Sequence, residues 1–98
     1  MTFYKDPEKN EIKSLHKFID FAGKRVLEIG CGEGRLTWRY ASASLSAFGL
    51  DPKKDALRVA TIDRPSDLVD KVHFANAQAE HIPFRKETFD IAILAWSL

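Results

Sequence analysis

The chain has 98 residues and forms one domain at most, of a size that buries about two-thirds of its unfolded surface. Hydrophobic residues make up 45% and charged residues 30%, which is ordinary for a globular chain and excludes general disorder. A formal net charge of +1 gives no general attraction to nucleic acid or to an acidic membrane. The longest apolar run is too short to span a bilayer, and we expect no secretory leader. The single cysteine excludes an internal disulfide and favours a cytoplasmic location.

Apolar patterning predicts helices and strands that alternate along the chain. A first helix begins at Asp6-Pro7, with Asp as N-cap and Pro at the first helical position, and ends at Gly23. Short apolar runs without polar alternation then indicate buried strands, and apolar residues at helical spacing indicate helices. The expected order is strand 25–29, helix 33–42, strand 45–50, a helix opening at Asp51-Pro52 and closing by Pro65, strand 72–75, a loop and strand 89–96.

This alternation predicts an α/β domain over residues 1–98, with a truncated parallel sheet of about four strands and flanking helices. Right-handed crossovers place strand 25–29 centrally, strands 45–50 and 72–75 on one side, and strand 89–96 on the other. The chain reverses direction between the first and fourth of these strands. Ligands bind above the carboxyl ends of the strands at such a point.

Residues 26–34 read VLEIGCGEG, an apolar strand that runs into a glycine-rich turn, and Asp51 follows one strand–helix–strand unit later. Such a unit builds a nucleotide site, because the glycines admit a ligand close to the backbone and the acid binds ribose hydroxyls. The glycines are spaced G-x-G-x-G, and Arg35 stands where the dinucleotide fingerprint has its third glycine. This spacing disfavours a dinucleotide-dependent oxidoreductase.

The blocks VLEIGCGEGR, FGLDP, AQAEHIPF and FDIAILAWSL occur in this order, and with them the chain resembles the class I S-adenosylmethionine-dependent methyltransferases over residues 10–98. The resemblance implies a Rossmann-like three-layer sandwich, S-adenosylmethionine as cofactor and S-adenosylhomocysteine as its product. It also implies in-line methyl transfer, most often to a small molecule, although protein and RNA acceptors occur. The sulfonium methyl is already activated, so the protein mainly supplies alignment. We therefore assign no catalytic residue in this chain.

The resemblance implies a set of cofactor-binding residues: Glu28, Gly30, Cys31, Gly32, Gly34, Asp51, Pro52, Gln78 and Ala79. The glycines would lie against the methionine end of the ligand; the alternative is a tight strand-to-helix turn. Glu28 would lie beneath the methionine amine, or its carboxylate is instead satisfied by local amides or by Arg35. Asp51 would bind the ribose hydroxyls, and its alternative role is a helix N-cap.

The adenine end of the expected site departs from the family pattern at one residue. Gln78 stands where family members often carry an aspartate that accepts from the adenine amine, and its amide oxygen accepts without charge assistance. Ala79 would offer its backbone amide to a ring nitrogen. Pro52, with Leu50 and Ile82, would form apolar walls for the purine.

Two residue types carry no chemistry of their own in this interpretation. Cys31, between two glycines of the turn, is expected to be a small buried residue rather than a reactive thiol. The three histidines have no ligand spacing, so no metal site is expected; they are His16, His73 and His81.

The strand at residues 89–96 is fully apolar, and at a sheet edge its backbone groups would stay unpaired. In the resembled family further strands and helices follow it and supply much of the acceptor site. We therefore expect either a part of a larger protein or association with another copy or a partner along residues 89–98. Accordingly, a non-catalytic S-adenosylmethionine-binding half-domain or partner subunit is the alternative to a methyltransferase.

Overall fold

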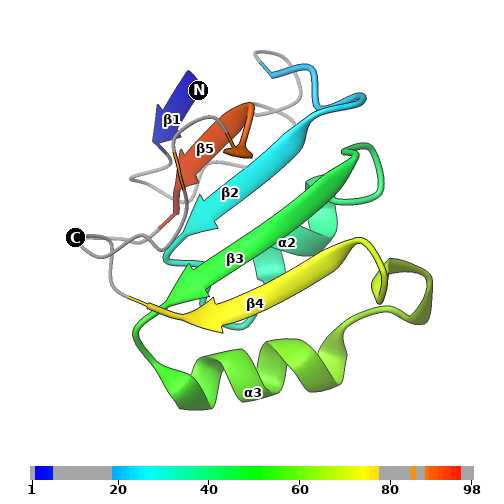
Figure 1. Ribbon diagram of the computed structural model, residues 1–98. Coiled ribbons are helices and arrows are strands. Elements are labelled where there is room, and N and C mark those ends of the chain that lie inside the picture. Colours follow the sequence, from blue (N-terminus) through cyan, green and yellow to red (C-terminus); the bar gives the residue numbers. More distant parts are fainter. Residues whose placement is uncertain (1, 6–18, 78–84, 86–87, 96–98) are drawn as a thin grey trace.

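The computed structural model describes residues 2–5, 19–77, 85 and 88–95, and only the backbone of residues 2–5. One five-stranded sheet, with all strands parallel, has the order β1-β5-β2-β3-β4 (Figure 1). The predicted α/β class and the predicted order of four strands are confirmed. The bounds of the strands in this order are β1 (Thr2–Lys5), β5 (Ile91–Leu94), β2 (Arg25–Ile29), β3 (Ser46–Asp51) and β4 (Val72–Asn76).

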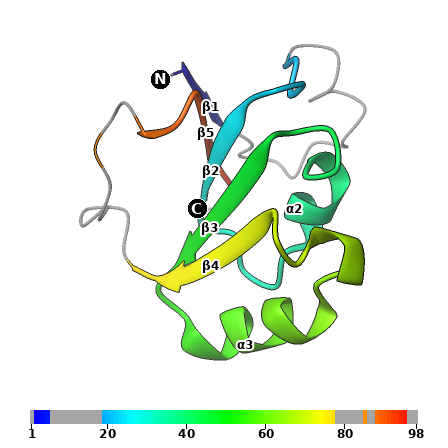
Figure 2. The same ribbon diagram turned by 45° about the vertical axis from the view of Figure 1, so that its right-hand side comes forward.

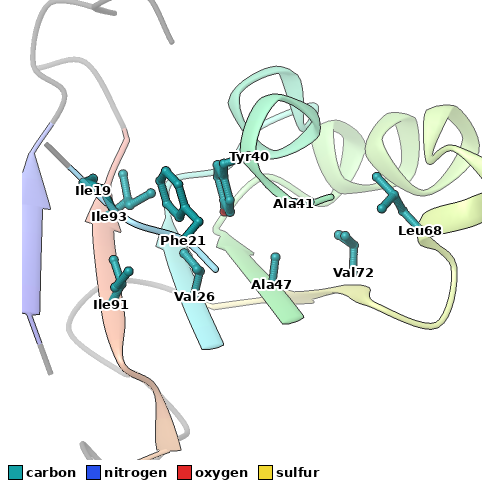
Figure 3. Packing of buried hydrophobic residues seen from close by; sticks show 10 residues of the cluster. All are labelled: Ile19, Phe21, Val26, Tyr40, Ala41, Ala47, Leu68, Val72, Ile91 and Ile93. Atoms are coloured by element: carbon teal, nitrogen blue, oxygen red, sulfur yellow. The ribbon is translucent and has the colours of Figure 1, made fainter. Parts of the chain in front are cut away.

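The helices follow the strands as predicted, with shorter bounds. The helix α2 (Arg35–Tyr40) connects β2 to β3, and α3 (Lys54–Asp63) with the short η1 (Ser66–Leu68) connects β3 to β4. Both crossovers step in the same direction along the sheet, so right-handed connections place α2 and α3 on the same face (Figures 2 and 3). Among the described residues, no helix combines the length and the apolar character needed to cross a membrane.

The central strand β2 is buried on both faces from Val26 to Ile29, which explains why this segment is apolar apart from Glu28. Val26 of β2 belongs to a cluster under α2 that includes the stacked rings of Phe21 and Tyr40, 4.9 Å apart (Figure 3). The next residue, Leu27, points to the opposite face, because successive strand side chains alternate. The second cluster there consists of Leu27, Ile29, Leu50, Phe89 and Ala92.

The predicted first helix is wrong over its last residues. Residues 6–18 lie outside the described residues, but Ala22 forms an antiparallel bridge with Ser44 and not a helical turn. Ile19 and Phe21 are buried, whereas the alternate residues Asp20 and Ala22 are exposed, as in extended backbone. The side chain of Asp20 also accepts the N–H of Ala22, a local bond that competes with the helix.

The strand β5 is not an edge of the sheet, contrary to the prediction. It pairs with β2 on one side and with β1 on the other, from Thr2 opposite Ile91 to Lys5 opposite Leu94. The expectation of an unpaired apolar edge is therefore wrong, because a segment from the beginning of the chain covers it. The two edge strands are β1 and β4.

An ion pair fixes the amino ends of β2 and β5 to each other. The Asp90 carboxylate accepts from the backbone N–H of Arg25 at 2.9 Å and from its Nε and Nη2 at 3.1 Å. The backbone N–H of Asp90 donates to the Arg25 carbonyl at 2.9 Å. The guanidinium lowers the pKa of Asp90 to about 2.

Candidate functional site

The glycine-rich turn lies at the carboxyl end of β2, between the ends of β3 and β5 (Figure 1). Gly30, Gly32 and Gly34 have φ angles of 83°, 55° and 89°, a left-handed conformation that glycine adopts without steric cost. The backbone N–H groups of Gly30 and Cys31 both donate to the Leu50 carbonyl, at 2.7 and 3.0 Å. These bonds anchor the turn to the end of β3.

Two glycines of the turn have different surroundings. Among the described residues, no atom lies within 4 Å of the position that a Cβ on Gly32 would take, so the described part of the chain leaves space beside this glycine. A Cβ on Gly34 would lie 2.5 Å from the Cζ2 atom of Trp38, because the indole packs directly against the turn. Trp38 in turn contacts Phe74 edge-on. Packing therefore explains Gly34, and a cofactor contact at this residue stays a prediction.

The Asp51 carboxylate joins the turn to the segment that precedes α3. One oxygen, Oδ2, accepts from the backbone N–H of Gly32 at 2.8 Å, and Oδ1 accepts from that of Lys53 at 2.8 Å. Asp51 is not the helix N-cap that the alternative predicts, since this position belongs to Lys53. A carboxylate offers about four lone-pair positions, so both oxygens keep acceptor capacity for ribose hydroxyls.

Glu28 is buried in β2 and is 1% exposed. Its Oε1 accepts from the hydroxyl groups of Thr37 and Tyr40, both at 2.8 Å. These two partners on α2 were not among the predicted ones, and the predicted Arg35 is exposed to solvent. The sequence carries a signal for them, because an acid in an apolar strand needs donors and hydroxyl residues three positions apart share a helix face.

Cys31 is buried within the turn, as predicted, and its thiol contacts the Gly32 carbonyl at 3.8 Å. Burial raises the pKa of the thiol above its usual range, and the negative charges of Glu28 and Asp51 raise it further. The thiol therefore stays protonated and is not the reactive group that the alternative would require.

The remaining predicted residues have mixed outcomes. Pro52 is exposed next to Asp51, whereas Leu50 is 1% exposed and packs in the second core cluster, so its contact with a purine stays a prediction. Gln78 and Ala79 lie outside the described residues, as does Ile82. Sequence reasoning missed Asn76, whose Nδ2 donates to the Asp51 carbonyl at 2.9 Å and links the carboxyl ends of β3 and β4.

Comparison with known proteins identifies the family. A sequence profile described as "Methyltransferase domain" matches residues 26–98. Methyltransferase GfsG of Streptomyces halstedii is 34% identical over 81 residues, which cover 80% of this chain and 29% of that protein. The crystal structure of YcgJ from Bacillus subtilis has a TM-score of 0.72 at 29% identity, covering 82% of this chain and 34% of that one.

A solved S-adenosylmethionine-dependent methyltransferase of Methanosarcina mazei is also 29% identical, with a TM-score of 0.68. The match covers 83% of this chain and 40% of that one. The chain thus spans about a third of the length of the relatives that it matches. The matched profile and the parallel sheet with its glycine turn place the chain in the family of class I S-adenosylmethionine-dependent methyltransferases, whose cofactor is S-adenosylmethionine.

Proposed function

We propose that this chain is the cofactor-binding part of a methyltransferase that transfers a methyl group from S-adenosylmethionine to a small-molecule acceptor. The observation that carries the proposal is a glycine turn in which the Gly32 N–H donates to the Asp51 carboxylate at 2.8 Å, with the buried Glu28 carboxyl two residues before Gly30. Their negative charge favours a ligand with sulfonium and ammonium groups and disfavours the pyrophosphate of a dinucleotide. The net charge of +1 supports an enzyme with no general attraction to nucleic acid, and the single cysteine supports the proposed cytoplasmic location.

The residues at the site have distinct proposed roles. Gly30 and Gly32 would admit the methionine end of the cofactor, and Asp51 would accept from both ribose hydroxyls. Glu28 would act beneath the methionine amine, and the adenine would lie near Pro52 and the residues Gln78 and Ala79. Bound in this way, the cofactor supplies a methyl group that is already activated, so this chain's residues need only hold it in line with the acceptor and exclude water.

Calorimetric titration with S-adenosylhomocysteine and with NAD tests the proposal. We expect S-adenosylhomocysteine to bind and NAD not to bind. Asp51→Ala should lower the affinity for S-adenosylhomocysteine by more than about 10-fold, because hydrogen bonds to a charged group are lost. The matched control is Asp55→Ala, since the Asp55 side chain is 98% exposed on α3. Preferential binding of NAD, or unchanged binding by Asp51→Ala, would contradict the proposal.

The length of the chain favours a second candidate, a non-catalytic S-adenosylmethionine-binding module, because the chain spans about a third of its relatives. A methyl-transfer assay on the isolated chain with a set of small-molecule acceptors separates the two candidates. Transfer above the rate of Asp51→Ala supports the enzyme. Cofactor binding without transfer to any acceptor supports the binding module.

Association of two copies through residues 89–98 stays a prediction. The pairing of β1 with β5 affects it, because β1 occupies the edge of β5 that a second copy would pair with. The strand β1 has to leave before another chain can pair with β5. Sedimentation velocity of the chain with and without residues 1–5 tests this condition. We expect a monomer when β1 is present and concentration-dependent association when it is deleted, whereas a monomer in both forms excludes pairing at this edge.

A further inference from the structure

We infer that Thr37 and Tyr40 are positioning residues, which hold the charge of Glu28 beneath the glycine turn and so set the affinity for the amino-acid end of the cofactor. The inference rests on the proposed function, because it concerns the same site. It assigns a role to two buried side chains of α2 whose hydroxyls reach Glu28 in β2.

The geometry is a hydrogen-bond network that joins three buried groups. Both hydroxyls donate to one oxygen of Glu28 at 2.8 Å, and the exposed fractions are 0% for Thr37, 0% for Tyr40 and 1% for Glu28. Donors to a carboxylate favour its ionised form and fix its rotamer. Tyr40 remains a donor, because burial raises the pKa of its hydroxyl well above the ordinary value and Glu28 raises it further.

Stability alone does not require this network. The Tyr40 ring is held by its stacking on Phe21, with the planes inclined by only 16° (Figure 3), and a phenylalanine ring would pack in the same place. Replacing both partners of a buried polar pair by apolar groups of the same shape is often neutral or stabilising. A buried carboxylate with two dedicated donors therefore points to a function of the charge itself.

The charge of Glu28 reaches the turn where the ligand would lie. Glu28 precedes Gly30 by two residues, and its charge raises the pKa of the Cys31 thiol inside the turn. Glu28 is too deeply buried for direct contact with a ligand in this conformation, so its effect on the methionine ammonium acts through space or through a water molecule. A ligand that lacks the ammonium group should be insensitive to the network.

The test compares S-adenosylhomocysteine with 5′-methylthioadenosine, which retains the adenosine part but has no amino-acid end. Calorimetry is done on the wild type, Tyr40→Phe, Thr37→Val and Thr37→Ser. We expect Tyr40→Phe and Thr37→Val to weaken S-adenosylhomocysteine binding about 10-fold, as for loss of a hydrogen bond to a charged group. Binding of 5′-methylthioadenosine should change less than about twofold, and Thr37→Ser should behave as wild type, because it keeps the hydroxyl.

The matched control is Ser44→Ala, which removes a buried hydroxyl whose bond, to the Ala41 carbonyl at 2.8 Å, does not involve Glu28. It should leave both affinities unchanged. A double-mutant cycle of Tyr40→Phe with Glu28→Gln adds a second measurement. The double variant should lose no more affinity for S-adenosylhomocysteine than Glu28→Gln alone, because both substitutions act through the charge of Glu28.

Each other result overturns the inference. Equal weakening of both ligands, with a lower urea midpoint, would mean that the network only maintains the fold. Unchanged affinity for both ligands would mean that the charge does not reach the site, and the proposed function would still stand. Failure of the wild type to bind either ligand would instead remove the proposed function itself.

Discussion

The indole of Trp38 occupies the space that a Cβ on Gly34 would take, whereas no described residue occupies the corresponding space at Gly32. Two glycines of one turn are thus required for different physical reasons, one for packing and one for access. Both have positive φ angles, which cost a residue with a Cβ about 1–2 kcal/mol. Only at Gly34 does a clash add to this cost.

We expect Gly34→Ala to lower the free energy of unfolding by about 2–5 kcal/mol, because overpacking adds about 1–3 kcal/mol to the backbone cost. Gly23→Ala is the matched control, since Gly23 has a φ of 70° and a Cβ there would meet no atom within 4 Å. Its loss should be about 1–2 kcal/mol. Urea denaturation followed by tryptophan fluorescence measures both, and equal losses would show that the Trp38 contact yields without cost.

Among the elements, β2 and β5 are joined at their amino ends by Asp90 and Arg25. The Asp90 side chain is 37% exposed, so this ion pair titrates in contact with solvent. Its pKa of about 2 in the folded chain lies below the ordinary value, because Arg25 donates to the carboxylate. The resulting stabilisation is fully present above about pH 4, the unfolded pKa, and is lost as the pH falls toward 2.

We therefore expect the urea midpoint of the wild type to decrease when the pH is lowered from 5 to 2.5. The decrease should be smaller for Asp90→Asn, because the amide has no proton to gain at this position. Asp55→Asn serves as control, because the Asp55 oxygen lies 3.9 Å from Arg58 in a pair that is almost fully exposed. Its acid dependence should equal that of the wild type. The same acid dependence for Asp90→Asn would mean that the ion pair does not contribute.

The elements that the sequence predicts well are those with a strong local pattern. The strand β2 is found because it is a short, mostly apolar run, and the helix α3 because its apolar residues recur at helical spacing. The strand β1 is not, because four residues beside Asp6-Pro7 have no decisive pattern, and pairing with the distant β5 makes them a strand. Likewise the burial of Glu28 predicts that donors exist, but Thr37 and Tyr40 are identified only once α2 is placed on the sheet.

For the whole molecule, the site predicts that ligand binding and folding are coupled. The turn and Asp51 lie at the carboxyl ends of β2 and β3 and take their shape from bonds between these strands, so an unfolded chain has no site. S-adenosylhomocysteine at about 100 times its dissociation constant should raise the free energy of unfolding by about 2.7 kcal/mol. Urea denaturation with and without the ligand measures this, and an unchanged midpoint for a chain that binds in calorimetry would contradict the coupling.

The pairing of Thr2 with Ile91 joins residues that are far apart in the sequence. The long loop between β1 and β5 closes slowly, because the chain loses conformational entropy before the two strands make contact. The elements β2, α2 and β3 are neighbours in sequence, so contacts among them form sooner. The β1–β5 ladder should therefore form last as the chain folds and open first when it fluctuates. Deuterium uptake at the amides of β1 should precede uptake at those of β2. The strand β1 would then open and close over β5 while the rest of the sheet stays folded.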